Sequence, residues 1–245
     1  MMGNVKELIK SSALLNFNVV ERDRWVAVQA ASLPRGAVVL DAGAGSCPYR
    51  SLFAHCNYKT QDFTSLQGDQ LSGRQYGAID YVCDIAAIPV DDNSFDAILC
   101  SEVIEHVPDP VAVMAEFSRI LKPGGRLILT APLGSGIHQE PYHFYGGYTP
   151  FWYEKVLSDK GFAKINVQAN GGSMKAFSQE ALRFAQMTIP FASTIPLFVS
   201  LTWLPFWLLL LPLLVGVIPV AAHLLDRYDE KQHFTVGYFV TAVKE

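Results

Sequence analysis

Apolar and polar positions alternate along most of the chain in short runs, which predicts strands separated by helices. Apolar, often β-branched runs typical of buried strands occur at 38–40, 79–85, 97–100, 126–132 and 234–243, and two further strands are expected at 58–62 and 164–168. Apolar residues at helical spacing occur at 5–32, 110–121, 150–160 and 173–187. Strands that alternate with helices predict an α/β fold with a doubly wound, mostly parallel sheet.

A glycine-rich turn follows the first predicted strand. Residues 38–40 lead into Asp41, then Gly43 and Gly45, and a proline suited to begin a short helix over about 48–55. Glycine can take positive φ and lets the backbone approach a ligand closely. The pattern is typical of the nucleotide-binding corner of a doubly wound sheet. A carboxylate directly before the glycines suits a ligand with a positive charge and hydroxyl groups.

A second acid lies at the end of the second predicted strand. Asp62 follows the glycines by about 20 residues, where doubly wound folds place an acid on ribose hydroxyls. The alternative is a solvated loop aspartate.

The leading helix, with Val5, Leu8 and Ile9 on one face, either packs on the sheet or covers the cofactor.

Composition narrows the class of partner. The chain has 245 residues, 17% of them charged, with a formal net charge of −4 and no basic block. Nucleic acid is therefore not expected as a partner, because phosphate binding needs clustered Lys and Arg. The four cysteines form no C-x-x-C pair and have no histidine at zinc spacing, so no metal site is expected. Residues 1–10 lack the apolar core of a signal peptide.

Three further motifs follow the D-A-G-A-G turn in order: D-I-A-A-I-P-V-D-D-N-S-F-D-A-I, S-E-V-I-E-H-V and L-K-P-G-G-R-L-I-L-T-A-P. Together they resemble the type-11 class I S-adenosylmethionine (SAM) methyltransferases over about residues 38–162. Cys47 stands where the first motif of that family has its last glycine. The resemblance implies a seven-stranded Rossmann-like sheet, whose last strand pairs antiparallel with the sixth, and SAM as cofactor.

The resemblance also implies a cofactor site. Asp84 and Ile85 would lie at the adenine, and Ser101 and Glu102 beside the methionine part. The full set of expected cofactor residues is Asp41, Gly43, Gly45, Asp62, Asp84, Ile85, Ser101 and Glu102.

The loop after the fifth strand is rich in histidine and tyrosine. Because it leaves a strand at its carboxyl end, we expect it to face the cofactor and the acceptor. His143, and after it His138, are the candidate general bases, since imidazole titrates near neutral pH. The alternative is that both only build the loop. His106 is expected to brace the turn after the fourth strand.

Residues 188–225 contain no Asp, Glu, Lys or Arg, which is too apolar for a surface insertion in water. Five prolines interrupt the stretch and argue against one straight spanning helix. If the sixth and seventh strands pair, both ends of the stretch emerge on one side of a membrane. A hairpin of two short spans, a re-entrant hairpin or a segment lying in the interface then remain.

Basic residues flank both ends, as expected for cytoplasmic ends: Lys175, Arg183, Arg227 and Lys231. The sequence thus predicts a SAM-binding domain over 1–171, an apolar helical insertion over 172–232, and the last strand within 233–245. We expect a SAM-dependent methyltransferase at the cytoplasmic face of a membrane, anchored by residues 188–225, with a lipid-linked or hydrophobic acceptor. The alternatives are a soluble small-molecule methyltransferase whose insertion is a lid or homodimer contact, and a non-catalytic SAM-binding membrane module.

Overall fold

A computed structural model describes residues 12–71 and 75–245. The expected helical positions Val5, Leu8 and Ile9 lie outside these residues, as does the expectation for residues 1–10. The chain divides into two compact units, which we describe separately. The sheet unit comprises residues 22–168 and 237–245, and the helical unit comprises residues 169–236 with the described residues up to Glu21.

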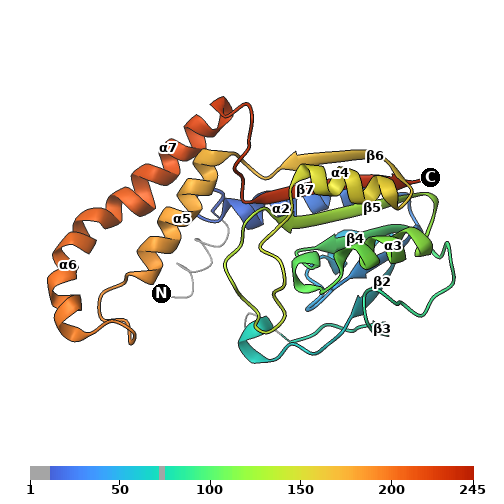
Figure 1. Cartoon of the computed structure of the whole chain (residues 1–245), viewed down its shortest axis with the longest axis horizontal. Helices are drawn as coiled ribbons and strands as arrows, with labels where there is room; N and C mark the ends of the chain where they lie inside the picture. The colour runs from blue at the N-terminus through green and yellow to red at the C-terminus, as the bar shows by residue number, and fades with distance from the viewer. Residues whose placement is uncertain (1–11, 72–74) are drawn as a thin grey trace. The chain divides into compact units, whose positions relative to one another are not determined.

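A seven-stranded sheet with the order β3-β2-β1-β4-β5-β7-β6 forms the sheet unit (Figure 1). Its strands are β1 (Val38–Ala42), β2 (Asn57–Asp62), β3 (Tyr81–Val82), β4 (Phe95–Ser101), β5 (Leu121–Pro132), β6 (Phe162–Ala169) and β7 (Gly237–Lys244). The strands β1 to β5 pair in parallel, and β7 pairs antiparallel with β5. The expected doubly wound α/β fold is confirmed, with β7 inserted beside β6.

The sequence predicted the starts of two helices of the sheet unit correctly. Helix α3 (Pro110–Ile120) begins after Asp109, whose side chain accepts a hydrogen bond from the Ala112 amide at 3.0 Å. Helix α4 (Pro150–Asp159) begins after Thr149, which caps it in the same way. In both helices a proline occupies the first turn, where its missing N–H leaves no bond unmade.

Two elements of this unit are shorter than the sequence predicted. Instead of a helix over 48–55, a 3₁₀ helix, η1, covers Arg50–Phe53 only. The backbone at Cys47 has φ of 55°, and the Arg50 amide donates to the Cys47 carbonyl, so the chain turns tightly into β2. The third strand, expected over 79–85, is reduced to Tyr81–Val82 at the sheet edge.

Helix α2 (Phe17–Ala31) packs on the sheet through its second half. Val26 and Ala30 are fully buried in one cluster with Val39 and Leu99 of the central strands. Trp25 stacks on Phe239 of β7 with ring centroids 5.0 Å apart. The packing alternative for the leading helix is therefore the one observed.

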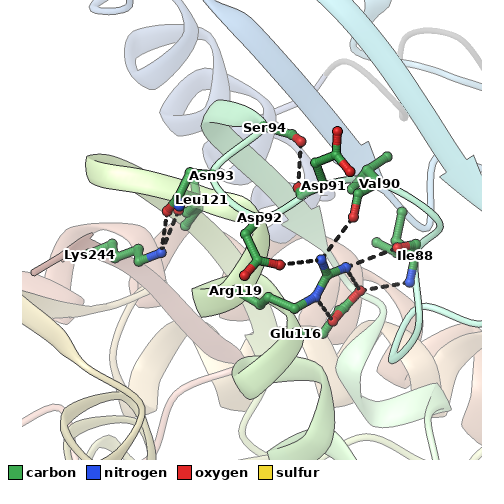
Figure 2. A network of polar contacts seen from close by, with 10 residues as sticks. All are labelled: Ile88, Val90, Asp91, Asp92, Asn93, Ser94, Glu116, Arg119, Leu121 and Lys244. Atoms are coloured by element: carbon green, nitrogen blue, oxygen red, sulfur yellow. Dashed lines mark hydrogen bonds and ion pairs between the residues drawn. The ribbon is translucent and has the colours of Figure 1, made fainter.

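One polar network fixes the segment between β3 and β4 to helix α3 (Figure 2). Arg119 of α3 donates to the carbonyl oxygens of Ile88 and Val90 and to the carboxylates of Asp92 and Glu116. The Ile88 amide in turn donates to Glu116 at 2.7 Å. This network joins the D-D-N-S-F-D motif to Arg119, which lies two residues before the L-K-P-G-G motif.

The helical unit contains helix α5 (Ser173–Met187), then α6 (Leu197–Pro212), a π-helical turn η4 (Leu213–Val217), α7 (Ile218–Leu225) and a short 3₁₀ turn η5 (Asp226–Tyr228). The last four join into one apolar helix of 32 residues, Leu197–Tyr228. The expectation that the prolines of residues 188–225 argue against one long helix is wrong, and of the arrangements left open, two short spans are not formed. The π-helical turn directly follows Pro212, and such a turn absorbs the interruption that a proline makes in the hydrogen-bond ladder.

The apolar helix returns alongside α5, and polar contacts join the two at both ends. At one end the Asp226 carboxylate accepts from the Gly172 and Lys175 amides, and Asp229 accepts from the Ser173 amide at 2.7 Å. At the other end two tryptophans of α6 donate to carbonyl oxygens near the end of α5. The hairpin therefore consists of the amphipathic α5 and one long apolar helix.

Candidate functional site

The glycine turn, residues 43–48, connects β1 to η1 and is held by the end of β2. The Gly43 amide donates to the Gln61 carbonyl at 2.9 Å and lies 3.2 Å from the Gln61 side-chain oxygen. The Gly45 amide donates to the Asp62 carboxylate at 2.9 Å. Both glycines have positive φ, 75° and 51°, which a residue with a Cβ adopts only at a cost.

The two glycines face different surroundings. A Cβ at Gly43 would lie 2.4 Å from a methyl group of Val103, so the segment after β4 packs directly on the turn. A Cβ at Gly45 would meet no atom within 4 Å. The turn is thus closed at Gly43 and open at Gly45, where a ligand can approach the backbone.

Cys47 is accommodated by a glycine that faces it. A Cβ built on Gly77 would lie only 2.4 Å from the Cys47 sulfur. The same sulfur lies 3.7 Å from the guanidinium group of Arg50. Burial raises the pKa of this thiol. The side chain at position 47 therefore points away from the open side of Gly45, toward the segment before β3.

Asp41, the residue before the last one of β1, has a buried side chain that is only 3% exposed. The Tyr58 hydroxyl donates a short hydrogen bond to it. Burial raises the pKa of Asp41 to about 7, the Tyr58 bond opposes that rise, and the charge of Asp62 adds to it. A nearby cation would favour the ionised form of this carboxyl group.

Asp62 is also buried, and both of its carboxylate oxygens hold backbone. One accepts from the Gly45 amide, and the other accepts from the Thr64 amide at 2.9 Å. Each oxygen keeps a further lone pair, so the same carboxylate can still accept from a ligand hydroxyl. The role on ribose stays a prediction.

Ser101 and Glu102 come together at the end of β4 through Thr130 of β5. The Thr130 hydroxyl lies 2.9 Å from the Ser101 hydroxyl and donates to the Glu102 carboxylate at 2.8 Å. Glu102 has φ of 56° and forms an ion pair with Arg22 of α2 at 3.2 Å. Helix α2 thus contributes a charge to the edge of the sheet where the ligand is expected.

Asp84 and Ile85 follow β3, the edge strand of the sheet. Asp84 is exposed and accepts from the Ala86 amide at 2.9 Å, whereas Ile85 is 7% exposed. No contact links them to the glycine turn among the described residues. Their assignment to the adenine stays a prediction.

Three histidines, His106, His138 and His143, gather above the turn after β4; we call them the histidine cluster. The ring centroid of His138 lies 4.7 Å from that of His106 and 4.6 Å from that of His143. His143 Nε2 lies 3.0 Å from the Ser135 hydroxyl. Burial and the neighbouring imidazole of His138 lower the pKa of His143, which leaves it neutral and able to accept a proton at pH 7.

The loop that carries His138 and His143 also reaches the end of β2. The rings of Phe63 and Tyr142 meet edge to face with centroids 5.1 Å apart. Phe63 directly follows Asp62, so this contact brings the histidine cluster close to the acid that holds the glycine turn. The cofactor residues and the candidate bases therefore share one edge of the sheet.

Sequence reasoning missed several polar groups that this edge uses. Tyr58 and Gln61 lie on β2 beside the expected Asp62, and strand alternation alone places their side chains on opposite faces of the sheet. Arg22 and Thr130 gave no signal, since their roles depend on how α2 and β5 pack. Glu105, which is buried below the histidine cluster, was assigned no role.

The arrangement fits the cofactor that the resemblance implies. SAM carries positive charge and ribose hydroxyls, and the site offers the buried Asp41, the carboxylate of Asp62 and the open backbone at Gly45. The residue pattern of a type-11 methyltransferase therefore coincides with a donor and acceptor set suited to that molecule.

Comparisons with known proteins agree with this fit. Residues 40–129 match the family model described as a methyltransferase domain. A demethylmenaquinone methyltransferase of Renibacterium salmoninarum is 35% identical over 121 residues, which are 47% of this chain and 50% of that protein. A ubiquinone/menaquinone biosynthesis C-methyltransferase of Desulfotalea psychrophila is 29% identical over 171 residues, which are 66% of this chain and 68% of that protein. The chain thus spans half the length of the first relative.

The fold has solved counterparts. Phosphoethanolamine N-methyltransferase 2 of Haemonchus contortus, solved with S-adenosyl-L-methionine, aligns over 91% of this chain and 52% of its own, with a TM-score of 0.52 and 19% identity. At that identity the likeness shows the fold alone.

Proposed function

We propose that this chain, which belongs to the type-11 class I SAM-dependent methyltransferases, transfers a methyl group to a hydrophobic or lipid-linked acceptor at the cytoplasmic face of a membrane. The observation that carries the proposal is the combination of two features in one chain. The sheet unit has the glycine turn and acids of a SAM site, and the helical unit has a long apolar helix whose surface is largely exposed.

The sheet unit supplies the chemistry by positioning. SAM brings an electrophilic methyl group on a sulfonium. Asp41 would hold the positive charge of the cofactor, Asp62 the ribose, and the open backbone at Gly45 would let the cofactor lie against the turn. His143, with its lowered pKa, would take a proton from the acceptor. Holding both reactants in one geometry accounts for much of the rate that such a site can provide.

The helical unit supports membrane attachment through its exposed apolar surface. Among the described residues, one helix, Leu197–Tyr228, is long and apolar enough to cross a membrane. Its most apolar 18 residues have a mean hydropathy of 2.5, and 11% of them are buried. Leu209 is 76% exposed and Phe198 is 71% exposed. So much exposed apolar surface is destabilising in water unless a lipid or protein surface covers it.

Helix α5 favours attachment at the interface over a crossing. Its exposed apolar side chains include Phe177 and Met187, whereas Glu180 and Arg183 form an exposed ion pair at 3.3 Å. Charged groups are costly in the hydrocarbon core but not at its boundary. With Asp226 joining the ends of the hairpin, we infer that the insertion dips into one leaflet and returns.

The relatives support the proposed acceptor class. The names of both curated relatives refer to quinone biosynthesis, whose intermediates are apolar. A membrane-attached enzyme could take such an acceptor directly from the lipid. The two features point to the same class of acceptor, a quinone-type ring that carries an apolar chain.

Replacing Ser173–Gln232 with a short Gly/Ser linker tests the attachment. The full chain should sediment with membranes and resist high-salt washing, because the contact is apolar. The shortened chain should remain in the supernatant and still bind SAM. A full chain that is a monomer in water without detergent would overturn the attachment. A soluble dimer that dissociates on truncation would instead identify the insertion as a subunit contact.

A single substitution gives a sharper version of this test. Leu209→Glu should weaken binding to anionic phospholipid vesicles at least tenfold, because a charge on this exposed face must enter the lipid. The matched control is Val28→Glu, at a residue of the sheet unit that is 60% exposed. Equal vesicle affinity of the two variants would contradict the proposed face.

The catalytic assignment has its own experiment. His143→Ala should lower kcat for a demethylated quinone acceptor at least tenfold while changing SAM affinity less than twofold. His55→Ala, at a histidine that contacts the Leu33 carbonyl away from the loop, is the control. Full turnover in His143→Ala would remove this residue from the mechanism.

A further inference from the structure

Glu105, His106 and His138 direct possible metal-ligand atoms toward one point. One atom from each of these residues lies within 4.8 Å of the other two. His106 ends the short helix η3 (Ile104–His106), and His138 comes from the loop after β5. The cluster is thus built by two segments that lie far apart in the sequence.

Hydrogen bonds to carbonyl groups fix which imidazole nitrogens are free. His106 Nδ1 lies 2.5 Å from the Tyr142 carbonyl oxygen, and His138 Nδ1 lies 2.9 Å from the Gly136 carbonyl oxygen. A carbonyl only accepts, so each Nδ1 must carry the hydrogen. Each Nε2 then holds a lone pair, and this carbonyl support is the usual arrangement behind a metal-binding histidine.

Glu105 presents a carboxyl group that the protein does not satisfy. Its side chain is almost completely buried, at 1% exposure, and its Oε2 has no hydrogen-bond partner. Its Oε1 lies 3.7 Å from His106 Nε2, which is too far for a hydrogen bond. Two acceptor atoms that face each other in a buried place are stabilised by a proton or a cation between them.

We propose that Glu105, His106 and His138 bind one divalent transition-metal ion. Ligand atoms about 2.1 Å from a metal lie roughly 3 to 3.6 Å from each other, so the 3.7 Å separation of Glu105 and His106 needs only a small adjustment. The three ligand atoms lie within 4.8 Å of one another, so His138, on its exposed loop, must move further toward the ion. One carboxylate oxygen with two imidazole nitrogens suits zinc, iron or manganese. Because His138 is exposed, the ion would keep an open position toward solvent.

Metal binding divides the roles of the loop histidines. A coordinated His138 has no free lone pair on its metal-binding nitrogen and cannot act as a base. His143 then remains as the proton acceptor, which rests on the proposed function. The metal site itself does not depend on methyl transfer.

The test uses full-length protein in detergent micelles, treated with chelator and titrated with Co²⁺ by absorption and with Zn²⁺ by calorimetry. We expect one ion per chain. Glu105→Gln and His138→Ala should each weaken binding at least tenfold, and His55→Ala should leave it unchanged. His138 is exposed, so its variant should fold, and unchanged SAM binding verifies this.

The outcomes separate this inference from the proposed function. Absence of a stoichiometric ion, or equal affinity in His138→Ala and His55→Ala, overturns the metal site. Neither result bears on SAM binding or methyl transfer, which are measured separately. Conversely, an inactive chain that still binds one ion through these residues retains the metal site and refutes only the proposed reaction.

Discussion

The buried carboxyl group of Asp41 should make SAM binding depend on pH. Burial raises the pKa of Asp41 to about 7. A positively charged ligand prefers the ionised carboxylate, so binding must release the proton wherever one is present. Affinity for SAM should therefore increase as the pH rises through 7.

The size of the effect follows from the pKa. With a pKa of about 7, about nine tenths of the Asp41 groups are protonated at pH 6 and about one tenth at pH 8. If only the ionised form binds, the apparent Kd at pH 8 is about tenfold lower than at pH 6, or about 1.4 kcal/mol. Binding at pH 7 then releases about half a proton per chain.

Titration calorimetry at pH 6, 7 and 8 in two buffers of different ionisation enthalpy measures both quantities. Asp41→Asn is the control, because it keeps the shape but cannot titrate, while the ligand's own amino group titrates in both proteins. The variant should bind SAM at least tenfold more weakly at pH 8 and lose the slope that Asp41 contributes. Equal pH slopes in the two proteins would refute the assignment of the cation to Asp41.

Three further predictions rest on individual contacts. Tyr58→Phe removes the donor to Asp41, so the pKa of this carboxyl should rise by about one unit and SAM affinity at pH 7 should fall roughly fivefold by calorimetry. Asp226→Ala removes the acceptor at the start of α5 and should cost about 1–2 kcal/mol, measured as faster amide hydrogen exchange in α5 than in α3. Arg119→Met leaves the buried Glu116 carboxylate without its cationic partner and should lower the urea-unfolding free energy by about 1–3 kcal/mol, whereas Lys155→Met, at an exposed ion pair, should change it by less than about 0.5 kcal/mol.

Local patterns in the sequence were enough to place most elements of the sheet unit. Asp109 before Pro110 and Thr149 before Pro150 are cap signals that act within one turn, and both helices begin there. The end of β1 was likewise visible as an acid that follows an apolar run. Where a structural preference is satisfied by neighbours in the sequence, the sequence alone predicts it.

Two predictions were wrong because the backbone conformation outweighed a local residue preference. The proline at position 48 favoured a helix start, but the positive φ at Cys47 turns the chain into a 3₁₀ helix. The prolines of residues 188–225 favoured breaks, but the π-helical turn after Pro212 lets the helix continue. In both places the backbone has an uncommon conformation that residue preferences do not encode.

The histidine cluster and the base of the insertion are both held by hydrogen bonds to backbone groups. His106 and His138 are oriented by the carbonyl groups of Tyr142 and Gly136, which any residue could supply, so no side-chain pattern announces the cluster. The same holds for the insertion, whose base is closed by Asp226 accepting from the Gly172 amide, 54 positions away in the chain. Because that contact joins the two ends of the insertion, the chain can leave β6, form a long apolar hairpin and return to begin β7 beside it. A sheet of this kind can thus carry a long apolar insertion without losing the pairing of its last two strands, which is why the proposed membrane attachment and the SAM site can be tested independently.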